Sequence, residues 1–100
     1  MYVMVRHKVQ DYAKWKKVFD EDAGDIEKAG FKKYGLYRTS GEPNDLTLFL
    51  EIDDVNKVKE FMNSEKGKSR MKEGTVIGTP ELVFLDRIEK KDYSELKKVA

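Results

Sequence analysis

The stretch Glu81-Leu82-Val83-Phe84-Leu85-Asp86-Arg87-Ile88 decides the fold, because it has the pattern of a β-strand that is apolar on both faces. Side chains alternate across a strand, so Leu82 and Phe84 face one way while Val83 and Leu85 face the other. In a chain of 100 residues, one layer of helices covers only one face of a small sheet. The simplest cover for the second face is an identical sheet from a second copy. The sequence therefore predicts a homodimer that joins through its sheet face and encloses an interior.

The composition indicates one domain with a heavily charged surface. Hydrophobic and charged residues each make up 39% of the chain, and the net charge is only +1. Lysines are interleaved with acidic residues, so we expect no nucleic-acid partner. The chain has no cysteine, which excludes disulfides and thiolate sites and suits the reducing cytoplasm, our expected location. Charge interrupts residues 1–7 after five residues, which predicts neither a signal peptide nor a membrane span.

Periodicity and turn residues predict an α+β, ferredoxin-like βαββαβ order with a hairpin in the middle. The expected elements are a strand over 2–9, a helix capped by Asp11 and stopped at Gly30, a strand over 31–39, a hairpin turn over 40–45, a strand over 46–52, a helix from Asp53 or Asp54, a short helical turn over 64–72 and a strand over 81–88. We expect Gly74 and the run Gly78-Thr79-Pro80 to break the chain before that last strand. The order predicts a four-stranded antiparallel sheet with both helices on one face. The domain is expected to occupy residues 1–89.

A charged tail over 90–100 follows the predicted domain. Its apolar residues Tyr93, Leu96 and Val99 recur at spacings of three. This pattern allows a short helix that docks on a partner subunit, and fraying is an equal alternative. A third interpretation makes the tail an interaction module for another protein, which truncation at Glu89 would disable.

Several runs within residues 2–89 share a pattern with a known family. They are Val5-Arg6-His7-Lys8-Val9, Asp11-Tyr12 with Trp15, Lys16, Val18, Phe19 and Asp20, Glu42-Pro43-Asn44, Leu48-Phe49-Leu50-Glu51, and Gly74 to Glu81 followed by Val83-Phe84-Leu85. The pattern resembles the dimeric α+β-barrel superfamily, in its group of antibiotic-biosynthesis-monooxygenase-like or "cyclase"-like small proteins. The resemblance implies a homodimer whose two sheets pack into a barrel, with a cavity in each subunit between sheet and helices. It also implies that some relatives oxidise polyketide-like aromatics without a cofactor, and that others bind haem.

His7 is the only histidine and the only candidate catalytic residue. On the expected first strand it shares a face with Val3, Val5 and Val9. An imidazole in an apolar wall can act as a general base, because its ordinary pKa lies near neutrality. The alternative is a buried histidine whose ring nitrogens bond to a neighbouring tyrosine or to backbone.

Aromatic side chains are the candidate ligand contacts. A cavity for a small hydrophobic or aromatic ligand is expected to be lined by His7, Trp15, Phe19, Tyr37, Phe49 and Phe61. Trp15 and Tyr37 are singled out because their polar atoms need partners if they are buried. The alternative is that these rings are simply core. Two arginines on expected strands, Arg38 and Arg87, are candidates for binding a carboxylate or phenolate, or for salt bridges.

No metal or cofactor is expected. One histidine, no cysteine and no carboxylates at ligand spacing leave no convincing metal site. Haem-degrading relatives carry a histidine on the second helix, whereas this helix has Val58, Phe61, Met62 and Asn63. The glycines match neither a dinucleotide-binding nor a P-loop pattern.

Two functions of different classes remain open at this point, and whether the protein is an enzyme is undecided. The first is a small-molecule-binding homodimer, with cofactor-independent oxidation of an aromatic substrate as its activity. In that case His7 removes a proton while Trp15 and Tyr37 orient the ring. The second is a non-enzymatic dimer, a stress-associated or accessory protein whose core is filled. The volume of the interior distinguishes the two.

Overall fold

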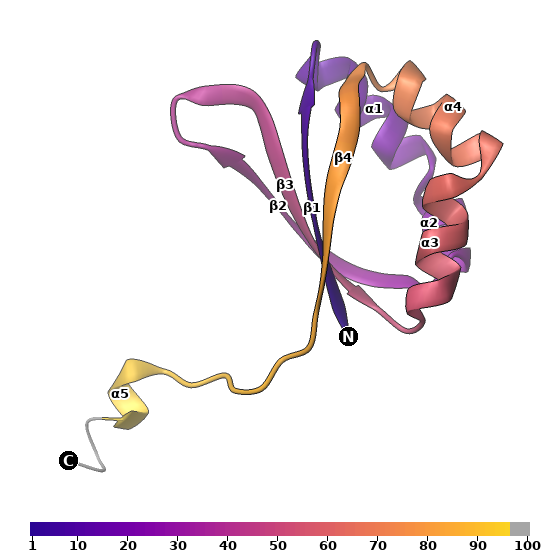
Figure 1. Cartoon of the computed structure of the whole chain (residues 1–100). Helices are drawn as coiled ribbons and strands as arrows, with labels where there is room; N and C mark the ends of the chain where they lie inside the picture. The colour runs from indigo at the N-terminus through magenta and orange to yellow at the C-terminus, as the bar shows by residue number, and fades with distance from the viewer. Residues whose placement is uncertain (97–100) are drawn as a thin grey trace.

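The computed structural model describes residues 1–96 and places four helices on one face of a four-stranded antiparallel sheet (Figure 1). The elements are β1 (Tyr2–Val9), α1 (Tyr12–Glu21), α2 (Ala23–Lys28), β2 (Phe31–Thr39), β3 (Glu42–Ile52), α3 (Val55–Asn63), α4 (Glu65–Glu73), β4 (Val76–Leu85) and α5 (Tyr93–Leu96). The strand order is β2-β3-β1-β4. The ferredoxin-like prediction is confirmed. None of the described helices is long and apolar enough to cross a membrane.

Polar side chains cap the helices where the sequence predicts. The Asp11 carboxylate accepts the Lys14 backbone N–H at 3.1 Å, and the Asp54 carboxylate accepts the Asn56 N–H at 2.8 Å. The Ser64 hydroxyl accepts the Gly67 N–H at 2.9 Å and so begins α4. These bonds satisfy N–H groups that have no partner within the helix.

The single helix expected from Asp11 to Gly30 is instead two helices. It is interrupted at Asp22, which has φ −88° and ψ 5° and lies between α1 and α2. The helical spacing of apolar residues continues across the interruption, which is why the sequence pattern did not reveal it. Gly30, with φ +96°, allows the turn into β2.

Two strands begin earlier in the chain than expected. β3 begins at Glu42 rather than at residue 46, and the hairpin turn is confined to Ser40 and Gly41. β4 begins at Val76, runs through Gly78 and Pro80, and ends at Leu85 rather than at residue 88. The pairing of β1 with β4 shifts register in this part of β4, and Gly78 has φ +70° there. A bulge on an edge strand accommodates both the glycine and the proline that were expected to break the chain.

The two faces of the sheet differ in what covers them. On the helix-covered face, Val3 pairs with Leu50 and Phe84, and Val5 pairs with Leu48 and Leu82. Ten apolar residues form the buried core between this face and the helices: Val3, Val5, Val9, Trp15, Phe31, Leu46, Leu48, Leu50, Ile52 and Val58.

The opposite face, here called the open face, carries the alternate residues of each strand. Met4 pairs there with Phe49 and Val83, and Tyr2 pairs with Leu85. The alternation predicted for the last strand is therefore confirmed. Phe49 remains 43% exposed and Leu85 38%, because none of the described helices covers this face of the sheet (Figure 1).

The chain leaves the sheet after Leu85 and extends away from it (Figure 1). A short helix, α5, forms at Tyr93–Leu96, as the spacing allowed. Val99 lies outside the described residues. The boundary between the domain over 1–89 and the tail over 90–100 stays a prediction.

Gly67 provides a test of how closely α3 and α4 are packed. A Cβ at this buried position would collide with the Phe61 carbonyl oxygen, whereas a Cβ at Gly24 in α2 would meet nothing. We expect Gly67→Ala to lower the free energy of unfolding by about 1–3 kcal/mol, the usual range for overpacking. Gly24→Ala should leave it unchanged or raise it by up to about 1 kcal/mol. Urea denaturation measures both variants, and equal effects would contradict this packing.

Candidate functional site

A cavity of about 110 Å³ lies between the sheet and the helices. Its walls are almost entirely apolar and include Val5 and Leu48 of the sheet and Ile26, Met62 and Met71 of the helices. Four of the lining residues have nitrogen or oxygen in their side chains: His7, Trp15, Asp22 and Arg70. An apolar enclosure with a few polar groups is the usual form of a small-molecule site.

His7 lies on β1 with its side chain on the helix-covered face. The residue is 8% exposed, and its ring centroid lies 5.3 Å from that of Trp15. Among the described residues, neither ring nitrogen has a hydrogen-bond partner. The expected alternative, bonds to a tyrosine or to backbone, is therefore not what the structure contains. Buried polar groups are almost always paired, so this histidine is an exception that requires an explanation.

Burial also decides the charge of His7. Desolvation lowers its pKa below the ordinary value of 6.5, and the attraction of the Asp45 carboxylate opposes this only in part. The ring is therefore neutral at pH 7. It carries one N–H donor and one nitrogen lone pair, and both ring nitrogens are closed off from solvent.

Aromatic rings form one side of the cavity next to His7. Trp15 and Phe19 lie one turn apart on α1, and their rings stack at 5.0 Å between centroids with planes 15° apart. Phe61 of α3 lies opposite the β2 residue Phe31, edge to face, at 6.1 Å. Trp15, Phe19 and Phe61 thus lie around the same cavity as His7. Their roles as ligand contacts stay predictions.

Tyr37 and Phe49 do not lie at this cavity, which corrects the expected lining. In β3, Phe49 alternates with Leu48 and Leu50, whose side chains face the helices, so Phe49 projects from the open face. Tyr37 pairs with Thr47 on the same open face and is 58% exposed. The two rings contact each other edge to face at 5.9 Å. The prediction placed all the aromatic residues together without separating the two faces of each strand.

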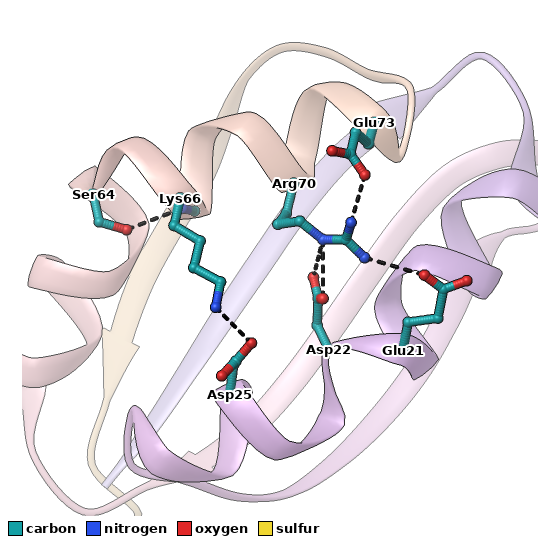
Figure 2. Close-up of polar contacts among 8 residues, drawn as sticks. Glu21, Asp22, Asp25, Ser64, Lys66, Arg70 and Glu73 are labelled. Carbon is teal, nitrogen blue, oxygen red and sulfur yellow. Dashed lines mark hydrogen bonds and ion pairs between the residues drawn. The ribbon is translucent and has the colours of Figure 1, made fainter.

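Arg70 and three carboxylates connect the two helix pairs. Arg70 Nε donates to both oxygens of Asp22 at 2.9 Å, Nη2 donates to Glu21 at 3.3 Å, and Nη1 donates to Glu73. Figure 2 shows the guanidinium reaching from α4 to the junction of α1 and α2. We call Glu21, Asp22, Arg70 and Glu73 the Arg70 cluster. Because Asp22 and Arg70 also line the cavity, the cluster fixes part of its wall.

The charges of the Arg70 cluster do not cancel. One guanidinium faces three carboxylates, so the cluster carries a net charge of −2. Hydrogen bonding with Asp22 raises the pKa of Arg70 above its ordinary value, and the group stays charged at every accessible pH. Beside the cluster, Lys66 and Asp25 pair at 2.9 Å and neutralise each other (Figure 2).

The sequence did not reveal the Arg70 cluster, because Asp22 and Arg70 are 48 residues apart and only the tertiary fold brings them together. A weak signal for the helix interruption was present. Asp20, Asp22, Gly24 and Asp25 all have low helix propensity, and they stand together within the expected helix. Nothing in the spacing pointed to Arg70.

The other candidate arginines lie away from the cavity. The Arg38 guanidinium lies 4.6 Å from the centre of the Tyr12 ring, and that of Arg87 lies 4.9 Å from the Tyr2 ring, distances that suit cation–π contacts. Among residues 1–96, no three side chains of metal-ligating type come together.

A buried carboxylate stands on the open face near His7. Asp45 is 3% exposed and accepts hydrogen bonds from Arg6 Nη2 at 2.8 Å and from the Thr39 hydroxyl at 2.9 Å. The bond from Arg6 and then the one from Thr39 lower the pKa of Asp45 to about 2. Asp45 is therefore ionised and fully bonded, unlike His7.

Comparison with known proteins identifies the fold. No family model and no curated protein matches the chain. Among solved structures, a Bordetella bronchiseptica protein classed with the antibiotic biosynthesis monooxygenases aligns with a TM-score of 0.72 at 16% identity, over 88% of this chain and 96% of that one. A protein of the same class from Caulobacter crescentus aligns with a TM-score of 0.66 at 23% identity, over 88% of this chain and 89% of that one.

A third solved structure is SnoaB, a cofactor-independent oxygenase from Streptomyces nogalater. It aligns with a TM-score of 0.67 at 14% identity, over 90% of this chain and 96% of SnoaB. The chain therefore has the same ferredoxin-like α+β fold as these antibiotic biosynthesis monooxygenases. The resemblance predicted from the sequence is confirmed at the level of the fold.

The Arg70 cluster leads to a stability prediction. Arg70→Met leaves Asp22, whose side chain is only 15% exposed, without its counter-charge and lets three carboxylates repel one another. We expect a clear fall in the midpoint of urea denaturation. Lys66→Met is the matched control, because Lys66 is 66% exposed and belongs to a simple surface pair, which contributes little. Equal midpoints for the two variants would show that the cluster does not hold the helices.

The single histidine allows a clean pH prediction. The unfolded chain takes up a proton on His7 near pH 6.5, whereas the folded chain resists it because the folded pKa is lower. The stability from neutral His7 is therefore complete above about pH 6.5 and is lost as the pH falls toward the folded pKa. Urea denaturation across this range should show a slope in wild type that His7→Leu removes. An unchanged slope in the variant would contradict a buried neutral ring.

Proposed function

We propose that this protein binds a small, mainly apolar molecule in the cavity beside His7 and oxidises it as a homodimer. The observation that carries the proposal is the unpartnered imidazole in an apolar cavity. A buried polar group without a hydrogen-bond partner lowers stability, and a ligand that supplied the missing bond would offset this loss. The fold shared with SnoaB, described as a cofactor-independent oxygenase, supports the reaction type.

The proposed reaction starts with His7 as general base. The neutral ring accepts the proton of a substrate hydroxyl group, and the phenolate that results has carbanion character at the ring carbon opposite the oxygen. Molecular oxygen adds to that carbon, and His7 gives its proton to the resulting peroxide anion to form a hydroperoxide. Neutral His7 then removes the remaining hydrogen of that ring carbon as a proton while the O–O bond breaks and hydroxide departs. That proton and the hydroxide form water, so one phenol and one O₂ become one quinone and one water.

The aromatic neighbours of His7 have a positioning role in this proposal. Trp15 stacks on Phe19, and the Trp15 ring centroid lies 5.3 Å from that of His7. A substrate ring placed against these side chains would lie beside the imidazole. Phe61 also lines the cavity.

The homodimer is proposed to form through the open face. Tyr37, Phe49 and Leu85 are large apolar side chains that this chain leaves exposed there. A second copy with the same face would bury them, and the two sheets would then pack into a barrel. Tyr37 and Phe49 would serve the subunit interface rather than the ligand. The absence of cysteine suits a cytoplasmic location.

The alternative of a dimer with a filled core is less well supported. The rings Trp15, Phe19 and Phe61 leave about 110 Å³ between them and the sheet, where a filled core would leave no such space. Native mass spectrometry of protein from a rich lysate reads the subunit count and any retained organic molecule together. A dimer with an added mass supports the proposal, and a monomer contradicts the role of the open face.

The catalytic role of His7 is tested by oxygen consumption with a panel of hydroxyaromatic compounds. We expect His7→Leu to lower the rate by about 10²–10⁴-fold, the usual contribution of a general base. Tyr37→Phe, on the open face, should leave the rate unchanged, and both variants should keep the wild-type oligomeric state. A His7→Leu variant that turns over at the wild-type rate would refute the role of His7.

A further inference from the structure

The size, the charge and the hydrogen-bonding groups of the cavity together define a class of ligand. This inference rests on the proposed function, since it assumes that a ligand enters the cavity beside His7. It goes beyond that function by stating which ligands the cavity accepts and which it refuses.

The size of the cavity limits the ligand to about one ring. A sealed apolar cavity of about 150 Å³ holds one benzene, and sites for drug-sized molecules measure about 300–1,000 Å³. The cavity here measures about 110 Å³. A second fused ring exceeds this space, so it would fit inside only if the helices moved apart and would otherwise stay outside the cavity. The Arg70 cluster opposes that movement, because Arg70 bonds to Asp22 and Glu21 across the two helix pairs.

The charge of the cavity wall disfavours anions. Asp22 and Arg70 are partly solvent-accessible, with side chains 15% and 24% exposed, so they form a polar edge where a substituent would meet them. The Arg70 guanidinium is already occupied by three carboxylates, and the cluster is left with a net charge of −2. A carboxylate placed beside it would be repelled and would find no free cation in the cavity lining among the described residues.

The imidazole defines the polar group that the ligand must carry. Neutral His7 has one donor and one acceptor, both without partners among the described residues, and the walls around it are apolar. A hydroxyl group can donate to the one nitrogen or accept from the other. A hydrocarbon of the same shape would fill the space and leave the imidazole unsatisfied, which weakens binding.

We propose that the cavity binds neutral, single-ring hydroxyaromatic molecules, with the hydroxyl on His7 and the ring on Trp15 and Phe19, and that it rejects carboxylated and fused-ring analogues. Each of these three preferences depends on a separate feature of the cavity. His7 selects the hydroxyl group, the Arg70 cluster excludes the anion, and the volume excludes the second ring.

Three pairwise comparisons test these features by fluorescence titration. Trp15 is the only tryptophan and lines the cavity, so its emission reports occupancy of this site. Phenol should bind about tenfold more tightly than toluene, which has the same shape without the hydroxyl. 4-Hydroxybenzamide should bind about tenfold more tightly than 4-hydroxybenzoate, which differs mainly in charge. Phenol should bind more tightly than 1-naphthol.

Two variants assign the preferences to their residues. His7→Leu should remove the preference for phenol over toluene while toluene still binds. Glu73→Gln removes one negative charge from an exposed position of the Arg70 cluster, and it should narrow the gap in affinity between 4-hydroxybenzoate and 4-hydroxybenzamide. Glu65→Gln, elsewhere on α4 and outside the cluster, is the matched charge control.

The outcomes separate this inference from the proposed function. Tighter binding of 1-naphthol, or of 4-hydroxybenzoate over the amide, overturns the ligand class while leaving a small-molecule site in place. If the wild-type protein binds phenol no more tightly than toluene, the role given to His7 here is overturned. If Trp15 responds to none of the five compounds, both the ligand class and the proposed binding function fall.

Discussion

Four helices form a single layer on one face of the sheet, and side chains of a strand necessarily alternate between its two faces. With 100 residues the chain has one such layer, so one set of strand residues is buried and the other is not. Val3, Leu48 and Leu50 are buried within the core, while Phe49, between two of them in sequence, is 43% exposed. Both the cavity beneath the helices and the apolar open face follow from this asymmetry. The cavity belongs to the covered face and the proposed subunit contact to the other.

The cavity also depends on how the helical layer is divided. α1 and α2 meet at Asp22, α3 and α4 meet at Ser64, and the Arg70 cluster fastens one pair to the other. The cavity lies between this divided layer and the inner strands of the sheet, where Val5 and His7 of β1 line it. The ion pairs therefore position the cavity wall as well as stabilise the fold.

The sequence predicted those features that depend on neighbours along the chain. The four strands and the caps at Asp11 and Asp54 could be recognised from alternation and from a single side chain bonding to the next turn. The placement of Phe49 was also available, because Leu48 and Leu50 mark the inner face of that strand. Features that depend on distant contacts were missed: the bulge near Gly78 requires the pairing with β1, and the Arg70 cluster requires the packed helices.

Asp45 and His7 are two buried polar residues that differ in hydrogen bonding and in charge. They stand one position apart along paired strands, since His7 pairs with Leu46 and Lys8 with Asp45. Asp45 keeps its charge because Arg6 and Thr39 bond to it, and its pKa falls to about 2. His7 receives no bond within the described chain and gives up its charge instead. The two residues thus differ in hydrogen bonding as well as in charge, and the proposed ligand role of His7 depends on its lack of a partner.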